Sequence, residues 1–201
     1  MDFIADISWS EAVGSLANLT FLVLLIRRSV YCWPFGILGS GISIIAYIIA
    51  GLYSEAILYG FYVLIGIYGW YEWEKHADSQ KHIQPIQWQL KHHLLAILIA
   101  TAGMIGLGWF FSDVKGVSRP YEDAFSTSFA FVASYLEAKQ VLSGWIYWIV
   151  LNGFSVWLNN DRGLHLFALL AVVNTIMSIY GYYSWIKTKE KKEYSNSNVL
   201  D

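Results

Sequence analysis

The chain has 201 residues, of which 56% are hydrophobic, 17% aromatic and only 14% charged, and its formal net charge is −2. Soluble domains carry about 25% charged residues, and a chain this short has too much surface for so few charges to cover. The composition therefore argues against a soluble globular protein, and the charge gives no basic excess for binding nucleic acid. One cysteine, Cys32, cannot form an internal disulfide, which excludes a disulfide-built secreted module.

Seven apolar stretches follow one another along the chain, and a helix that spans a membrane needs about 20 such residues. In chain order they are 11–26, 33–50, 56–73, 93–111, 124–137, 145–158 and 164–186. Only helices or a closed barrel can cross a lipid bilayer, and these runs are too long and too evenly apolar for barrel strands. We therefore predict an all-α integral membrane protein with seven transmembrane helices.

The lysines and arginines predict the orientation of these spans, because cytoplasmic loops carry an excess of both. With the N-terminus outside, ten of them fall inside and only Lys115, Arg119 and Arg162 fall outside. The first nine residues are acidic and lack the basic start of a cleaved signal peptide, so we expect them to lead into the first span from outside. The sequence thus predicts an outer N-terminus and an inner C-terminus in the cytoplasmic membrane.

An internal repeat with an offset of 112 residues connects the two parts of the chain. It pairs the segment 68–73 (YGWYEW) with 180–185 (YGYYSW) and Trp33 with Trp145. The same offset, without gaps, also pairs Ile37 with Ile149, Gly41 with Gly153, Ser43 with Ser155, Gly51 with Gly163, Leu52 with Leu164, Ala56 with Ala168, Glu11 with Asp123, Arg27 with Lys139 and Lys75 with Lys187. We predict a 3+1+3 arrangement, in which two parallel three-helix bundles are related by an axis along the membrane normal.

The predicted boundaries follow from this repeat. They are an N-terminal three-helix bundle at 1–75, a cytoplasmic loop and linker helix at 76–122, a C-terminal three-helix bundle at 123–187 and a cytoplasmic tail at 188–201. The tail is mixed in charge and ends in polar residues, so we expect it to be flexible. Parallel repeats of this kind occur in transporters, whose substrate site lies near mid-membrane between the halves.

Polar and aromatic side chains inside the spans are the candidates for such a site, because polar groups are costly in lipid. Trp148 and Asn152 lie four residues apart on one face of the sixth span, and the third span contributes Tyr59 and Tyr62. The remaining candidates are Asn174, Ser178, Ser40 and Ser43. Clustered rings would bind a flat, cationic ligand by stacking and cation–π attraction.

Other residues in the spans are expected to serve structure. The glycines at 36, 39, 41 and 66 would permit close helix approach, and Trp9, Trp73, Trp109 and Trp185 lie near predicted helix ends, as in an interfacial belt. The histidines at 76, 82, 92 and 93 fit no zinc pattern and are expected in a solvated loop. Enzymatic motifs are missing, so no catalytic residue, metal ligand or cofactor is predicted. No carboxylate is evident at mid-depth, which favours facilitated diffusion over ion coupling.

Four segments carry a resemblance to the PnuC family of bacterial vitamin transporters. They are 33–36 (WPFG), 52–56 (LYSEA), 68–73 (YGWYEW) and 145–152 (WIYWIVLN), and the last matches the family's W-x-x-x-N element at Trp148 and Asn152. The resemblance covers nearly the whole chain and implies a fold similar to that of the sugar-transporting SWEET proteins. It also implies facilitated diffusion of nicotinamide riboside, thiamine or riboflavin across the bacterial inner membrane, with a cytoplasmic kinase that traps the vitamin.

The resemblance leaves the substrate open. Family members that carry nicotinamide riboside have Gln and Asn amides on the third helix, where this sequence has Tyr59 and Gly66. A more aromatic pocket favours thiamine, and nicotinamide riboside is the alternative. Two hypotheses from other classes remain, namely a sugar or nucleoside carrier and a non-transporting membrane receptor or scaffold. Homo-oligomer formation is left open.

Overall fold

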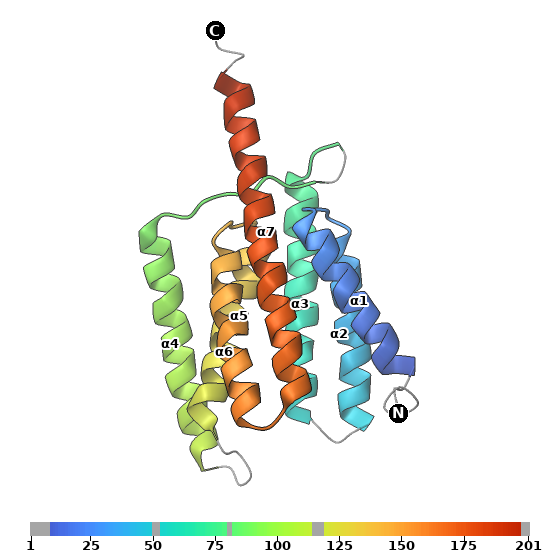
Figure 1. The fold of residues 1–201 in the computed structure, drawn as a ribbon, viewed down its shortest axis with the longest axis vertical. Helices are drawn as coiled ribbons and strands as arrows, with labels where there is room; N and C mark the ends of the chain where they lie inside the picture. Colours follow the sequence, from blue (N-terminus) through green and yellow to red (C-terminus); the bar gives the residue numbers. More distant parts are fainter. Residues whose placement is uncertain (1–8, 50–52, 80–81, 114–118, 198–201) are drawn as a thin grey trace. The chain divides into compact units, whose positions relative to one another are not determined.

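The computed structural model describes residues 9–49, 53–79, 82–113 and 119–197, and these form seven helices and no strand (Figure 1). The helices are α1 (Trp9–Ile26), α2 (Cys32–Ile49), α3 (Tyr53–His76), α4 (Leu90–Ser112), α5 (Pro120–Ala138), α6 (Gly144–Asp161) and α7 (His165–Ser197). Each predicted span coincides with one helix to within four residues, apart from the end of α7. Within the described residues, the predicted all-α fold with seven helices is therefore confirmed.

The last helix is longer than predicted. At about 1.5 Å per residue, the 33 residues of α7 reach about 50 Å, against a hydrocarbon core of about 30 Å. Figure 1 shows this helix (red) extending well past the end of α6. The backbone up to Ser197 is thus helical where a flexible tail was expected, because the lysine- and glutamate-rich sequence there suits a helix as well as it suits solvent.

Large apolar side chains cover the outside of the helices. Ile49, Ile57, Leu90 and Trp109 are each more than 70% exposed. Soluble monomers rarely leave contiguous apolar surface of this kind uncovered. Within the described residues, Leu90–Ser112 and Phe167–Glu190 are also long and apolar enough to cross a membrane on those criteria alone. The fold therefore has the surface of a protein whose surrounding solvent is lipid.

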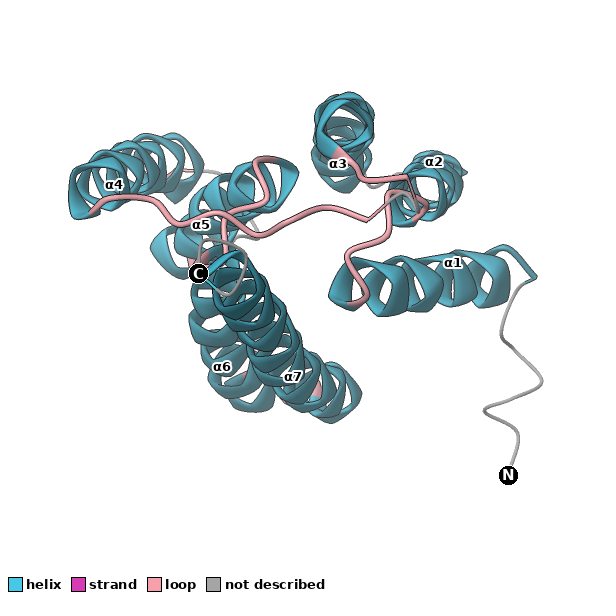
Figure 2. Cartoon of the chain, turned by 90° about the horizontal axis from the view of Figure 1, so that it is seen from above, coloured by secondary structure: helices cyan, strands magenta, loops and turns pink. Residues whose placement is uncertain are grey.

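The chain divides into two units, Met1–Gln84 and Pro85–Asp201. In the first unit, α2 packs against both α1 and α3. In the second unit, α5 packs between α4 and α6, and α6 packs against α7 (Figure 2). The division falls inside the region 76–122 that the sequence predicted as a linker, and α4 is part of the second unit.

A turn of the same geometry connects the first helix pair of each predicted bundle. Arg28 and Gln140, 112 positions apart, both have left-handed backbones, with φ of 61° and 62°. The Ser29 N–H donates to the Leu24 carbonyl at 3.0 Å, and the Val141 N–H donates to the Leu136 carbonyl at 2.9 Å. The left-handed residue ends the helix and reverses the chain. These matched hydrogen bonds support the duplication inferred from the sequence.

A buried pair of tryptophans forms the packing centre at one end of each unit. The Trp33 and Trp73 ring centroids lie 5.4 Å apart at 90°, and those of Trp145 and Trp185 lie 5.5 Å apart at 87°. Trp73 and Trp185 are fully buried, so their assignment to an interfacial belt is wrong. Each packs edge-on against the tryptophan at the start of the neighbouring helix, where burying two large rings outweighs interfacial anchoring.

Three further expectations have different outcomes. Trp109 is 72% exposed, as a belt residue would be. An added Cβ at Gly36, Gly39 or Gly66 would lie under 3.0 Å from a neighbouring side chain, which confirms the predicted close approach, whereas the space beside Gly41 is open and that prediction is wrong. Residues 1–8, the pair Gly51 and Leu52, and the side chains of Trp9 and Glu11 lie outside the described part of the chain.

Candidate functional site

The aromatic part of the candidate site in the second unit is Trp148 on α6. Its ring is half-buried and packs against a small core made of Ala130 and Ala133 of α5 and Leu151 of α6. Alanines at these α5 positions leave room for the indole, which is the reason that so large a ring can lie between two helices. Part of the ring surface remains accessible for a ligand.

The polar part of the site is Asn152, one turn further along α6. Its Nδ2 donates a hydrogen bond to Ser178 Oγ of α7 at 3.3 Å, and Ser178 is only 3% exposed. The amide oxygen, Oδ1, accepts no hydrogen bond among the residues that the structure describes. Asn152 is half-buried near the middle of α6, so a buried serine orients the amide and leaves an acceptor for another molecule.

An acidic side chain lies close to Trp148. Glu137, the penultimate residue of α5, is 6% exposed, and its carboxyl lies beside the indole nitrogen of Trp148 at a geometry outside the limits of a hydrogen bond. The sequence placed Glu137 near the end of a span, and its position in α5 agrees with that. The acid is therefore enclosed within the second unit next to the ring of Trp148.

Asn174 is the fourth candidate in the second unit. It lies one turn before Ser178 on α7 and is exposed. No hydrogen bond of its side chain is present among the described residues. The structure therefore brings together Trp148, Asn152 and Ser178, and leaves Asn174 at the surface of this unit.

The first unit contains the other four predicted residues. Tyr59 and Tyr62 of α3 pack edge to face, with ring centroids 5.6 Å apart at 86°. On α2, Ser40 is 7% exposed, and the Ser43 hydroxyl donates to the Gly39 carbonyl of its own helix at 2.9 Å. Ser43 thus has a local partner, as serines in membrane helices often do. Of the four candidates in this unit, it is the one least expected to contact a ligand.

A polar cluster that the sequence did not predict lies at the start of α4. His93 Nδ1 is 3.2 Å from the hydroxyl of Tyr147, and its Nε2 is 3.0 Å from Ser143 Oγ. Its expected place in a solvated loop is therefore wrong, because the first turn of α4 lies against the beginning of α6. Ser143 and Tyr147 lie 50 and 54 residues from His93 in sequence, so no local pattern could reveal the contact.

Charged side chains gather at helix ends. Arg162 donates to Asp123 at 2.9 Å, and Arg119 pairs with Asp161 and lies over the ring of Trp157. In the turn after α1, burial lowers the pKa of Arg28, an effect that nearby Asp78 partly opposes.

A shallow surface depression along the end of α3 is lined by Ile67, Trp70, Tyr71, Glu74 and Lys75, and it contains none of the predicted site residues. In the described residues, no three His, Cys, Asp or Glu side chains could hold a metal ion together.

Among the described residues, seven helices with large apolar side chains on their outer surface are the architecture of a multi-pass membrane protein. A sequence profile of the nicotinamide mononucleotide transporter family matches residues 8–187. The chain belongs to this family. The expected resemblance to PnuC proteins and the membrane transporter class are thereby confirmed.

Relatives support the same assignment. The riboflavin/roseoflavin transporter RibM of Streptomyces davaonensis is 26% identical over 91% of this chain and 87% of its own length. The nicotinamide riboside transporter PnuC of Escherichia coli is 23% identical over 93% of this chain and 89% of its own length. A crystal structure of the vitamin B3 transporter PnuC shares the fold, with a TM-score of 0.74, 21% identity and coverage of 94% of this chain and 86% of that one.

These comparisons confirm the function at the level of a transporter of the vitamin type. They give no support to the preference for thiamine, since neither relative is named for that vitamin, and they favour the alternative, nicotinamide riboside. The preference for thiamine, drawn from Tyr59 and Gly66, thus has no support from the relatives. Family membership also agrees with a multi-pass location in the inner membrane.

Proposed function

We propose that this chain carries nicotinamide riboside across the cytoplasmic membrane by facilitated diffusion, with Trp148 and Asn152 as the main ligand contacts. Nicotinamide riboside combines a flat pyridinium cation with a carboxamide and a ribose. The Trp148 ring can hold the cation by stacking and cation–π attraction. The Asn152 amide can bond the carboxamide or a ribose hydroxyl.

One observation carries the proposal: the hydrogen bond from Asn152 to Ser178, in a chain whose relatives include nicotinamide riboside transporters. The bond joins α6 to α7 and orients the amide, so that Oδ1 remains available. A polar group in mid-helix is costly in a membrane, so its presence there indicates a functional role. The beginning of α6 also carries the accessible ring on the same helical face.

The other candidates are proposed as further contacts. Ser178 orients Asn152, while Asn174 offers a second amide from α7. Tyr59, Tyr62, Ser40 and Ser43 of the first unit are proposed to contact the ligand too, with Ser43 last because its hydroxyl already bonds its own helix. Each of these is testable by single substitution.

The proposal also includes the membrane arrangement inferred from the sequence. The N-terminus lies outside and the C-terminus inside, and two bundles at 1–75 and 123–187 arise by duplication around the region 76–122, with a tail from 188. Matched turns and tryptophan pairs 112 residues apart support the duplication. A cytoplasmic kinase would trap the vitamin after entry.

A binding titration tests the substrate and the site together. The purified protein in detergent is titrated with nicotinamide riboside, riboflavin and thiamine. We expect the first to bind tightest, and Asn152→Ala to weaken it about tenfold, as loss of one or two hydrogen bonds would. Asn160→Ala, an exposed amide at the end of α6, is the matched control and should leave the affinity unchanged.

Riboflavin is the second candidate, because RibM is the relative with the higher identity. Riboflavin is a larger, neutral ring system, so its binding would not depend on a cationic ring. Tighter binding of riboflavin than of nicotinamide riboside would mean that riboflavin is the substrate, while the assignment as a vitamin transporter would stand. Unchanged affinity in both Asn152→Ala and Trp148→Ala would overturn the site.

A further inference from the structure

We propose that His93 of α4 is a positioning residue for the ligand-binding face of α6, an inference that rests on the proposed function. Both ring nitrogens of His93 meet hydroxyls from the beginning of α6, Ser143 at 3.0 Å and Tyr147 at 3.2 Å. Trp148 follows Tyr147 directly, and Asn152 is one turn further. The histidine thus acts on the helix that carries both proposed ligand contacts, without touching the ligand itself.

The first sign of this role is the behaviour of Ser143. It is the N-cap residue of α6, and a serine in that place normally accepts a hydrogen bond from a backbone N–H of the first turn. Here the side chain makes no such capping bond, and its hydroxyl lies against His93 instead. The Ser143 backbone is helical, with φ of −69° and ψ of −8°, which is outside the usual N-cap geometry. Its hydroxyl is therefore available for the contact between α4 and α6.

The second sign is the place of Tyr147. Its ring packs with Trp148 against the same small core of Ala130, Ala133 and Leu151. Both rings therefore contact the same small core, and His93 lies within hydrogen-bonding distance of the hydroxyl of one of them. Packed side chains transmit displacement to their neighbours, so a shift of the Tyr147 ring would disturb the core on which the Trp148 ring also rests.

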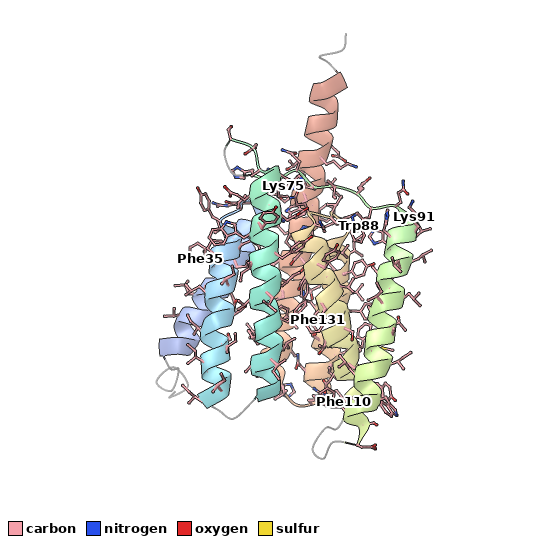
Figure 3. The ribbon with its side chains drawn as sticks, turned by 180° about the vertical axis from the view of Figure 1, so that it is seen from behind. Phe35, Lys75, Trp88, Lys91, Phe110 and Phe131 are labelled. Carbon is pink, nitrogen blue, oxygen red and sulfur yellow. The ribbon has the colours of Figure 1, made fainter. Side chains whose placement is uncertain are left out.

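The segment before α4 is itself hydrogen-bonded to the turn between α5 and α6. The Ile86 N–H donates to the Gln140 carbonyl, and the Leu142 N–H donates to the Ile86 carbonyl, both at 2.9 Å. Trp88 packs against the rings of His93 and Tyr135. Figure 3 shows Trp88 and Lys91 at this end of α4 and Phe110 near the other. His93 is therefore a fixed point from which α6 can be positioned.

The first unit has a different arrangement at the equivalent positions. With the offset of 112, Tyr147 corresponds to Phe35, Ser143 to Tyr31 and Trp148 to Gly36. Phe35 has no hydroxyl, and the space over Gly36 is filled by the ring of Phe21 from α1. The hydroxyl pair thus occurs only in the repeat whose helix carries the tryptophan of the W-x-x-x-N element. The histidine contact therefore lies in the repeat that carries the proposed ligand face.

Among helix pairs in the described residues, the backbone of α4 packs against α5 and not against α6. The His93 side chain bridges that separation. Its removal would leave two hydroxyls without a partner and free the Tyr147 ring to move. The α6 face should then bind ligand less well, although the fold is retained.

The experiment compares His93→Ala with His92→Ala, the exposed histidine next to it, in the full-length protein. Nicotinamide riboside affinity and the KM and maximal rate of transport are measured, together with the melting temperature. We expect His93→Ala to weaken binding about 3- to 10-fold, and His92→Ala to leave it unchanged. His93→Gln, whose amide can still reach a hydroxyl, should restore part of the affinity.

Tyr147→Phe provides the second variant, since it removes only the hydroxyl and keeps the packed ring. It should weaken binding to a similar degree, and the double variant should lose no more than the worse single one. A lower melting temperature of His93→Ala with unchanged affinity would mean a structural role and overturn the inference. If the unchanged protein binds none of the vitamins, the proposed function fails first; if it binds one and His93→Ala binds equally well, only the inference fails.

Discussion

Substitution of Gly181 by alanine should destabilise the protein through a steric clash that can be worked out from the structure. A Cβ at this position would lie 2.6 Å from two ring carbons of Trp145, where ordinary contact begins at 3.4 Å. Trp145 is 1% exposed, and Trp185 packs against its ring, so it cannot move aside. Overpacking of this kind costs about 1–3 kcal/mol, which lowers the melting temperature of a chain this size by about 2–12 °C.

Thermal unfolding in detergent, at one fixed scan rate because such unfolding is often irreversible, measures the effect. Gly153→Ala is the matched control, since it lies in the neighbouring helix and nothing would lie within 4 Å of its Cβ. The duplication extends the prediction to the first unit, where Gly69→Ala should clash with Trp33 and Gly41→Ala should not. A Gly181→Ala protein that melts with the parent would refute the reasoning on the tryptophan pair.

Three further predictions concern packing, ion pairs and the site. Trp185→Ala should cost about 3–5 kcal/mol, whereas Trp109→Ala, at 72% exposure, should change stability by no more than about 0.5 kcal/mol; equal losses in melting experiments would contradict this. Asp123→Asn should cost less than about 1 kcal/mol, because its partner Arg162 is partly exposed, and a larger loss would mean that the pair is structural. Ser178→Ala should weaken nicotinamide riboside binding about threefold, less than Asn152→Ala, and an unchanged affinity would mean that the hydrogen bond does not orient the amide.

The spans could be predicted because hydropathy depends only on local composition. Each predicted stretch coincides with a helix. The error lies at the end of α7, where the high charge predicts a solvated tail but the same residues have good helix propensity. The offset of 112 also identified equivalent positions before any contact was known. Trp33 and Trp145, paired in the sequence, occupy matching places in the two units.

Burial was predicted less well, because position near a helix end does not distinguish a belt residue from a core residue. Trp73, Trp109 and Trp185 all lie near predicted helix ends. Trp73 and Trp185 are nevertheless fully buried, whereas Trp109 is exposed. The difference lies in the partner ring at the start of the neighbouring helix. The contacts of glycines were equally hard to predict from position. Gly41 faces open space, although Gly36 and Gly39 of the same helix contact α1.

The candidate site was predicted in part. The spacing of Trp148 and Asn152 was sufficient to place them on one face, and the bond from Asn152 to Ser178 connects two of the candidates. His93 was missed because its partners come from a segment about 50 residues away. A contact that depends on how helices pack leaves no trace in the local pattern of either segment.

Counterflow of labelled nicotinamide riboside into liposomes that contain the purified protein tests the central claim most directly. We expect the unchanged protein to exchange the vitamin without a proton or sodium gradient, and Asn152→Ala and Trp148→Ala to slow the exchange at least tenfold. Asn160→Ala should exchange at the parent rate. No exchange of nicotinamide riboside by the unchanged protein, or equal exchange by all four proteins, would contradict the account.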